Sequence, residues 1–236
     1  MNAEQTEPID SQNHRTRVGI ERRQKMRTRL IESAFVVFSR MGVDVSVIDD
    51  VIAEAGVSRG TFYNYFRTNT ELMAAVGETL SDELVGLIEE TVGGLDDPVE
   101  ILATGLRLFL RTASAYPHFA DFIWRAGFNL DAAGSLIRTY LPRHIAASME
   151  RGSLQVADVF TALEVMMGIM LAAIFGISMR APADDYPERI VQHILQALGV
   201  QRQEALRLTA LPLPLPAISL PADSLIARSH QGKAAS

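Results

Sequence analysis

Apolar residues along this 236-residue chain recur at the spacing of α-helices, and no segment shows the strict alternation typical of a half-buried β-strand. The pattern is clear between residues 26 and 41, where an apolar side chain follows every three or four positions. Gly42 comes directly after this stretch, where a glycine commonly ends a helix. We therefore expect an all-α fold.

Two shorter helices are expected next. Ser46, followed by a carboxylate at Asp49, marks the start of a second helix that ends at Gly56. Ser58 is placed to cap a third helix over residues 59–66, which is too short to be stable alone. Two helices joined by a tight turn at a glycine have the layout of a helix-turn-helix.

Capping residues indicate where the later helices begin. Thr68 and Glu71 form a capping box for a fourth helix that reaches about Thr91, and Asp97-Pro98 supplies an N-cap and a first-turn proline for the next. That helix is expected near residues 98–115. The pattern predicts four more helices near residues 117–128, 131–150, 156–179 and 186–198.

The last of these helices is expected to begin at a second capping box, Asp185 with Glu188, and to end at Gly199. Beyond it, leucine and proline alternate from Leu211 to Pro216, which excludes a helix and favours an extended or polyproline segment. Residues 206–236 are therefore predicted to be either an arm along the body or a loose tail. The cost of leaving leucines in water favours the arm.

The elements divide into a three-helix N-terminal unit over residues 19–72 and a larger helical unit over residues 73–205, with about nine helices in all. Residues 1–18 are polar, lack the apolar core of a signal peptide and are predicted to be a disordered arm. The longest apolar run, Val165–Ile177, has 13 residues, fewer than the roughly 20 needed to span a bilayer. We interpret it as a buried helix and expect no membrane partner.

Charge is distributed unevenly along the chain, whose formal net charge is −6. Residues 15–40 carry eight basic side chains against two acidic ones, whereas residues 73–236 hold 12 basic and 18 acidic ones. A short basic segment on an otherwise acidic chain indicates a local contact with a polyanion, although a solvated helix face is the alternative.

The residue types present exclude several kinds of chemistry. With no cysteine, the chain has no disulfide framework, thiolate metal site or catalytic thiol, and an intracellular location fits. None of its five histidines is spaced from another as helical metal ligands are, and the chain lacks a nucleophile motif or a phosphate-binding glycine loop. We expect no metal, no cofactor and no enzymatic activity.

The third predicted helix carries side chains suited to the edges of DNA bases. In a helix-turn-helix the second helix enters the major groove by its N-terminal residues. Arg59 can donate to guanine or to a phosphate, Asn64 can pair with adenine, and Thr61 can reach a base edge or a thymine methyl. Tyr63 offers a ring face and a hydroxyl. An ordinary helical hairpin with surface aromatics is the alternative.

The stretch from Arg27 to Leu72 resembles the DNA-binding domain of the TetR/AcrR family of bacterial one-component regulators. The resemblance rests on Ala34, Phe38 and Gly42, on the run Ala55-Gly56-Val57-Ser58-Arg59-Gly60-Thr61-Phe62-Tyr63-Asn64-Tyr65-Phe66, and on Glu71-Leu72. It implies an all-α homodimer with a three-helix helix-turn-helix DNA-binding domain and a larger helical domain for effector binding and dimerisation. The partners it implies are a palindromic operator in double-stranded DNA and a small-molecule effector.

The resemblance also implies roles for individual residues. Base contacts are assigned to Arg59, Thr61, Tyr63 and Asn64, and phosphate contacts to Ser46, Gly60 and Tyr65, with the basic start of the first helix, which includes Lys25, nearby.

Three positions depart from the family's usual sequence. Asn69 stands where a phosphate-binding lysine usually opens the fourth helix, so either Arg67 replaces that contact or the contact is weaker. Ser46-Val47 replaces a pair of threonines, and Ile52 replaces a small alanine, which moves the two helices slightly apart.

The most apolar predicted helix, residues 156–179, contains glycines that allow close helix approach. Paired with the helix 186–198, it resembles the family's four-helix dimer interface, although the core helix of a monomer is the alternative. The interface residues assigned on this basis are Gly168, Leu171, Phe175, Ile190, Ile194 and Leu198.

Aromatic and methionine side chains form a candidate effector pocket, because flexible apolar faces suit variable hydrophobic ligands. Plain core packing is the alternative. Glu164 is nearly isolated inside the apolar helix, so we expect it to face either a cationic or hydrogen-bonding ligand or a partner such as Arg107 or Arg125. The candidates are Phe109, Phe122, Trp124, Phe128, Tyr140, Glu164, Met166 and Met170.

These observations predict a ligand-responsive transcriptional repressor in the bacterial cytoplasm, nucleoid-associated when bound, that a small, largely hydrophobic effector releases from DNA. An activator or ligand-independent regulator of the same fold is the alternative, and a helical interaction module is a more remote one.

Overall fold

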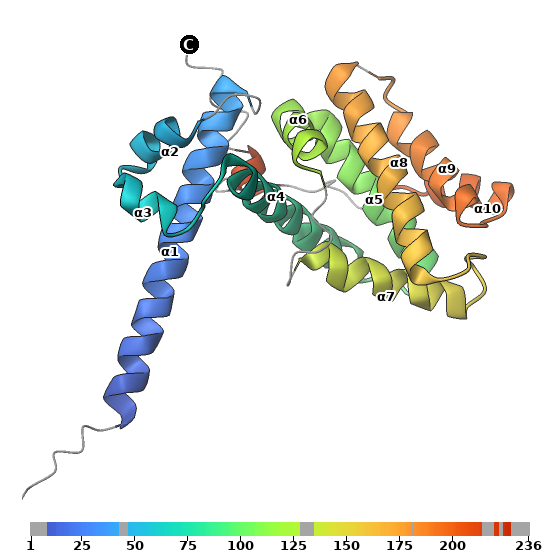
Figure 1. Ribbon diagram of the computed structural model, residues 1–236. Helices are drawn as coiled ribbons and strands as arrows, with labels where there is room; N and C mark the ends of the chain where they lie inside the picture. The colour runs from blue at the N-terminus through green and yellow to red at the C-terminus, as the bar shows by residue number, and fades with distance from the viewer. Residues whose placement is uncertain are drawn as a thin grey trace, which may run out of the picture. The chain divides into compact units, whose positions relative to one another are not determined.

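The computed structural model describes residues 9–42, 47–127, 135–180, 182–213, 220–221 and 224–227, with side chains described from Arg17 onward. Within these residues the regular structure is entirely helical, which confirms the predicted fold class. The chain divides into two compact units, residues 1–72 and residues 73–236 (Figure 1).

The first unit consists of α1 (Ile9–Met41), α2 (Ile48–Ala55) and α3 (Arg59–Tyr63). One face of α1 supplies most of its core, and α2 packs against this face. The first half of α1 extends past α2 and α3 (Figure 1). The fully or nearly fully buried side chains are Leu30, Ile31, Ala34, Phe35, Val37, Phe38, Val47, Val51, Ala55, Phe62, Phe66 and Leu72.

Three expectations about this unit need correction. Helix α1 begins at Ile9, so residues 9–18 are helical and do not form a disordered arm. Helix α2 begins at Ile48 with Val47 as its N-cap and without a side-chain cap, and Ser46 lies outside the described residues. Helix α3 ends at Tyr63, three residues earlier than predicted, because the chain turns after this residue.

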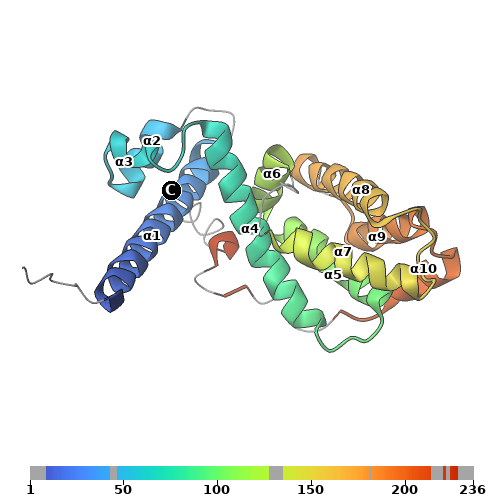
Figure 2. The same ribbon diagram turned by 60° about the horizontal axis from the view of Figure 1, so that its bottom comes forward.

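The second unit consists of α4 (Asn69–Val92), which begins within the first unit, α5 (Pro98–Ala115), α6 (Pro117–Ala126), α7 (Leu136–Glu150), α8 (Val159–Met179), α9 (Tyr186–Ala197) and α10 (Arg202–Ala210). Helix α5 is the central element, because α6, α7, α8, α9 and α10 all pack against it (Figure 2). Twelve of its 18 residues are buried.

The capping residues explain most of these helix starts. Thr68 Oγ1 accepts the Glu71 N–H at 3.1 Å, and the Glu71 carboxylate accepts the Arg67 N–H at 2.8 Å, so the two side chains cap α4 reciprocally. Asp97 caps α5, and Asp158 caps α8 by accepting the Thr161 N–H at 2.8 Å.

The C-terminal part of the second unit differs from the expectation in two ways. Helix α10 was missed, because residues 206–210 were assigned to the Pro/Leu-rich segment although their buried face packs on α5 and α9. Asp185 makes no side-chain cap at α9, and its carboxylate lies 3.1 Å from the Arg189 guanidinium instead. Glu188 binds the α5 residues Arg107 and Arg111.

A short piece of the C-terminal segment returns to α4. Ser224, Leu225 and Ile226 are buried, and the Leu225 N–H donates to the Glu83 carboxylate at 3.1 Å (Figure 2). These described residues therefore pack on the body at α4. Residues 214–219 lie outside the described residues.

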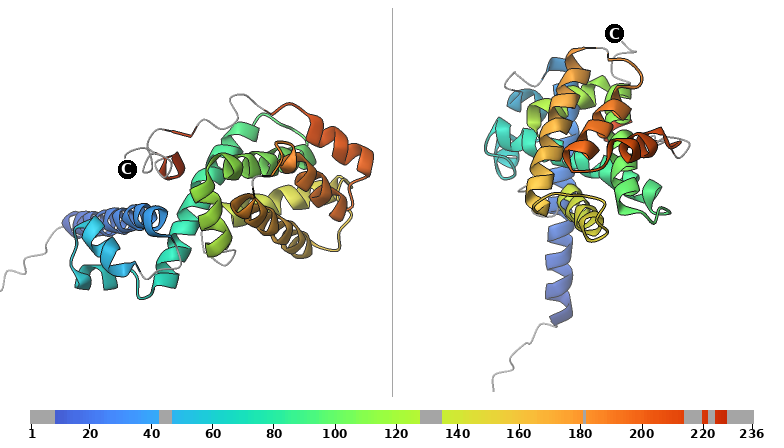
Figure 3. Two further views of the ribbon diagram at one scale, coloured as in Figure 1. Left: turned by 90° about the horizontal axis from the view of Figure 1, so that it is seen from above. Right: turned by 90° about the vertical axis from the view of Figure 1, so that its right-hand side faces the viewer.

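Helix α8 combines a buried and an exposed apolar face. By length and composition alone, it is the one described helix that could cross a membrane. In the second unit it packs against α5, α6, α7 and α9 (Figure 3). Phe160, Phe175 and Met179 nevertheless remain exposed on its other face.

Gly199 is a position where the turn after α9 requires glycine. Its φ of +89° is unfavourable for other residues, and a Cβ atom there would lie 2.6 Å from Gln155 Cβ and 2.9 Å from Gln155 N. We expect Gly199→Ala to lower the free energy of unfolding by at least about 2 kcal/mol, as measured by urea denaturation.

Gly94→Ala is the matched control, because a Cβ atom at Gly94 meets nothing within 4 Å. It should change stability by no more than about 0.5 kcal/mol. Equal effects of the two substitutions would show that the close approach to Gln155 is not a constraint.

Candidate functional site

Helix α3 presents a set of exposed side chains on a support made of buried ones. Phe62 is 0% exposed and contacts the Phe66 ring at a centroid distance of 6.1 Å, which fixes α3 on the core of the first unit. The Tyr63 ring contacts Phe62 edge to face and is still 48% exposed. The direction in which Tyr63 points therefore depends on the packing of Phe62.

The turn before α3 is determined by two residues. Gly56 has a φ of 60°, which ends α2 in a left-handed residue, and the Val57 N–H then donates to the Ile52 carbonyl at 3.2 Å. Ser58 Oγ accepts the Thr61 N–H at 3.1 Å and lies 2.9 Å from Thr61 Oγ1. The Thr61 hydroxyl is thus already engaged at the N-terminus of α3.

Arg59 at the start of α3 forms an ion pair that the sequence did not suggest. Its guanidinium lies 2.8 Å from the Asp49 carboxylate on α2, and both side chains are mostly exposed. An exposed pair of this kind is worth about 0–1 kcal/mol, so it orients Arg59 without preventing it from binding a stronger anion. A second ion pair, Arg40 with Glu54, joins α1 to α2.

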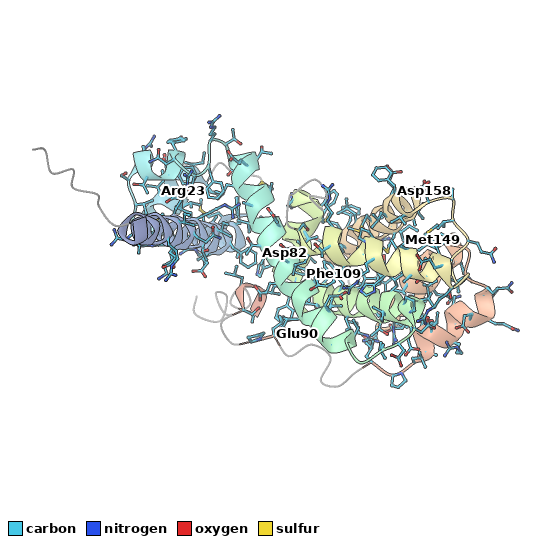
Figure 4. The ribbon with its side chains drawn as sticks, turned by 90° about the horizontal axis from the view of Figure 1, so that it is seen from below. Arg23, Asp82, Glu90, Phe109, Met149 and Asp158 are labelled. Atoms are coloured by element: carbon cyan, nitrogen blue, oxygen red, sulfur yellow. The ribbon has the colours of Figure 1, made fainter. Side chains whose placement is uncertain are left out.

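Basic residues of α1 border the exposed face of α3. The Arg23 guanidinium lies 6.0 Å from the centre of the Tyr65 ring. A surface hollow beside Arg23, which Figure 4 labels on α1, is lined by residues of α1 and by residues of α3 and the turn after it. This hollow combines cationic and hydrogen-bonding side chains, which suits a phosphate strand. Its lining residues are Gly19, Arg22, Arg23, Met26, Thr61, Asn64 and Tyr65.

Most of the residues predicted to bind DNA lie in this region of the first unit. Tyr63, Asn64, Tyr65 and Arg67 share a second surface hollow, and Gly60 is exposed on α3. Lys25 is exposed on α1. Asp49 was missed, since only the structure shows that it pairs with Arg59.

The second unit contains a cavity lined by residues of α4, α5, α7 and α8. Its volume is about 50 Å³. A cavity of about 150 Å³ is known to hold benzene, so a ring-sized ligand must displace the walls to enter this one. The lining residues are Val85, Ile88, Glu89, Ile101, Leu102, Gly105, Leu106, Phe109, Ile137, Tyr140, Leu141, His144, Met167 and Met170.

Only some of the predicted pocket residues reach this cavity. Phe109, Tyr140 and Met170 line it. Phe122 and Met166 are buried elsewhere, Trp124 packs on Phe175 at a centroid distance of 4.5 Å, and Phe128 lies outside the described residues.

The expectation for Glu164 was wrong, because this side chain is exposed and needs no buried partner. Arg107 is paired with Glu188 at 3.3 Å and Arg125 with Asp121 at 3.1 Å. Glu89 and His144, the ionisable residues in the cavity wall, were missed, because 55 residues separate them in the sequence.

Polar contacts at two acidic residues of α4, Asp82 and Glu89, join it to α7. Asp82 on α4 accepts the Leu136 N–H at the start of α7 at 2.8 Å, and the Ser135 hydroxyl lies 3.4 Å from the same oxygen. Two turns further along both helices, Glu89 contacts His144 at 3.1 Å. Figure 4 labels Asp82 on α4 and Phe109 of the cavity wall on α5.

The residues assigned to a dimer interface lie on different sides of the second unit. Gly168 and Phe175 are exposed on α8, and Leu171 is half-buried. Ile194 and Leu198 are at most 1% exposed within the single chain, so they belong to its own core. Ile190 is half-buried.

Of the two glycines on α8 expected to allow close helix approach, Gly176 does so within the single chain. A Cβ atom at Gly176 would lie 2.8 Å from the Tyr186 hydroxyl on α9, whereas one at Gly168 would meet nothing within 4 Å. Among the described residues, no group of three or more His, Asp or Glu side chains is arranged to hold a metal ion.

Asp82 provides a pH-dependent test of the α4–α7 contact. Burial raises the pKa of Asp82 above its ordinary value, against the opposing effect of the Leu136 hydrogen bond. The folded state therefore binds more protons than the unfolded state between these two pKa values. Stability from this group is present below the unfolded pKa and is lost as pH rises through the folded pKa.

Asp82→Asn keeps an oxygen that can accept the Leu136 N–H and removes the titration. We expect the stability of the variant relative to wild type to increase as pH rises from acid to neutral, measured by urea denaturation at a series of pH values. The exposed Asp184→Asn controls for net charge. A constant difference between Asp82→Asn and wild type would contradict the expectation.

Comparison with known proteins identifies relatives of both units. Residues 30–76 match the family described as bacterial regulatory proteins, tetR family, and residues 97–210 match the tetracyclin repressor-like, C-terminal domain. Two relatives from Bacillus subtilis (strain 168), the uncharacterized HTH-type transcriptional regulators YvdT and YfiR, are 32% and 36% identical over 69 and 63 residues. These matches cover 29% and 27% of this chain and 36% and 31% of the relatives.

Solved structures match over a larger part of the chain. RolR in complex with resorcinol is 29% identical with a TM-score of 0.68, covering 83% of this chain and 98% of RolR. RolR without ligand is 30% identical with a TM-score of 0.65, covering 80% and 98%. SmeT, the repressor of the Stenotrophomonas maltophilia multidrug efflux pump SmeDEF, shares the fold at 20% identity with a TM-score of 0.52, covering 72% and 89%.

Proposed function

Because the chain belongs to the TetR family of DNA-binding transcriptional regulators, we propose that it is a repressor that binds a palindromic operator as a homodimer and is released by a small, largely apolar effector. The observation that carries the DNA-binding part is the exposed face of α3, which projects Tyr63 and Asn64 beside the cationic hollow of α1. Base-contacting and phosphate-contacting groups are adjacent there, as recognition of a major groove requires.

The proposed division of contacts follows from these positions. Tyr63, Asn64 and Arg59 contact bases, with Arg59 exchanging Asp49 for a guanine edge, while Thr61 does so through its methyl group because Ser58 engages its hydroxyl. The phosphate contacts comprise Ser46, Gly60, Tyr65, Arg67 and Lys25 from the sequence prediction, and Arg22 and Arg23 from the hollow.

The exposed stripe of α8 supports the homodimer. Phe160, Gly168, Phe175 and Met179 present apolar surface that a single chain leaves in water, and one copy of this stripe can cover another. In this proposal the residues of α9 that meet the partner are its exposed ones, such as Arg189 and His193, rather than Ile194 and Leu198.

The cavity supports an effector-controlled repressor. RolR was solved with resorcinol and SmeT with triclosan, both small aromatic molecules, and the cavity of this chain is lined mainly by apolar side chains. A ring-sized effector enlarges the cavity and displaces its walls. One wall is α4, the helix that begins in the DNA-binding unit, so the effector favours a dimer whose recognition helices no longer match the operator half-sites.

The DNA-binding part is tested by footprinting the protein on the DNA upstream of its own coding region. We expect a protected palindrome, and Tyr63→Ala should weaken binding to it by about 10–100-fold, the value of a base contact. Helicity by circular dichroism and dimer size by light scattering should stay unchanged. Unaltered operator affinity of the variant would show that α3 is not the recognition helix.

Lys25→Gln distinguishes phosphate contacts from base contacts. It should reduce the slope of log K against log salt concentration by about one for each Lys25 contact that is removed. The preference for the operator sequence should stay unchanged. A change in sequence preference would contradict the assignment of Lys25 to the DNA backbone.

The effector part is tested by filling the cavity. Met170 is 2% exposed and lines the cavity, so Met170→Trp should abolish release from the operator by resorcinol-like aromatic molecules while operator affinity stays within about twofold of wild type. Leu206→Trp, at an exposed position of α10, is the control. Release of Met170→Trp at wild-type effector concentrations would place the effector elsewhere.

A further inference from the structure

The cavity wall is apolar except at one end. Glu89 from α4 and His144 from α7 lie there, and their side chains are 16% and 10% exposed. His144 Nε2 lies 3.1 Å from both oxygens of the Glu89 carboxylate. Arg143 Nη2 contacts the same carboxylate at 3.2 Å from the more exposed side. A carboxylate that has left most of its water thus borders an otherwise apolar space.

A carboxylate in this position accepts hydrogen bonds and donates none. It has about four acceptor sites on its two oxygens, and the contacts with His144 and Arg143 leave acceptor capacity that a ligand can use. A ligand hydroxyl that donates to Glu89 makes a charge-assisted hydrogen bond. A ring without a donor displaces water from the carboxylate and leaves the lost hydrogen bonds unreplaced. A ligand carboxylate brings a second negative charge into the same desolvated space.

We propose that Glu89 recognises a hydroxyl group of the effector, which makes the effector a small neutral ring compound carrying at least one hydroxyl. This inference rests on the proposed function of the cavity and adds the group that selects among apolar ligands. Sites that hydrogen-bond a ligand hydroxyl discriminate strongly against the analogue that lacks it, because the buried polar group is then left unpaired.

The same contact links binding to the wall that moves. In the free protein Glu89 attaches α4 to α7 through His144 and Arg143. A hydroxyl that donates to Glu89 competes with these two residues for its oxygens, so the bound state has a weaker α4–α7 contact than the free state. The attachment at Asp82, two turns away, remains. The same carboxylate, that of Glu89, thus recognises the ligand hydroxyl and controls the contact between α4 and α7.

The experiment measures binding of phenol, toluene and benzoate to the full chain by titration calorimetry. Wild type should bind phenol at least about tenfold more tightly than toluene, which has nearly the same shape, and should bind benzoate more weakly than phenol. Glu89→Gln should reduce the preference for phenol over toluene to about threefold or less. Glu90→Gln, the same change at the exposed neighbouring position of α4, should keep the wild-type preference.

The outcomes separate this inference from the function on which it rests. Toluene or benzoate binding as tightly as phenol overturns the inference, and so does a phenol preference that survives Glu89→Gln. If Met170→Trp abolishes binding of phenol in either case, the cavity remains the effector site and only the role of Glu89 is rejected. If none of the three compounds binds, both the role of Glu89 and the aromatic-effector cavity are rejected, while the operator footprint independently decides the DNA-binding function.

Discussion

A helix of five residues cannot persist in water by its own hydrogen bonds, and the surface that we propose to bind DNA is built on such a helix. Burial of Phe62 holds α3 in place, and the Ser58 cap and the left-handed Gly56 determine the direction in which it starts. Burial of Phe62 and Phe66 turns one side of this segment toward the core, so Tyr63 and Asn64 on the other side face solvent. The surface proposed to contact bases is therefore positioned by the hydrophobic core beneath it.

Helix α4 belongs to both units, since it begins in the first unit and forms a wall of the cavity in the second. Polar contacts at Asp82 and Glu89, rather than apolar packing alone, attach it to α7. A ligand that hydrogen-bonds to Asp82 or Glu89 can replace the polar contacts between α4 and α7. Apolar contacts between two helices are instead lost when the helices move apart. This difference makes α4 suited to respond to an effector.

Helix α8 shows how one element can satisfy two requirements. Its buried methionines Met167 and Met170 line the cavity, and the opposite face exposes Phe160, Phe175 and Met179 together with Glu164. A uniformly apolar helix has no periodicity that distinguishes a core face from an interface face. The sequence predicted the position of α8 in the chain. Ile194 and Leu198 of α9, which it assigned to an interface, are core residues of the single chain.

The sequence by itself determined the helical class, most helix positions and the short helix that carries Tyr63, because helical periodicity, capping residues and glycine turns act over a few neighbouring residues. Only the tertiary structure decided that Arg59 meets Asp49, that Glu164 faces outward and that Glu89 meets His144 in the cavity wall. These outcomes depend on which helix faces cover one another. That information is absent from local patterns, since periodicity shows that a face is apolar but not what lies against it.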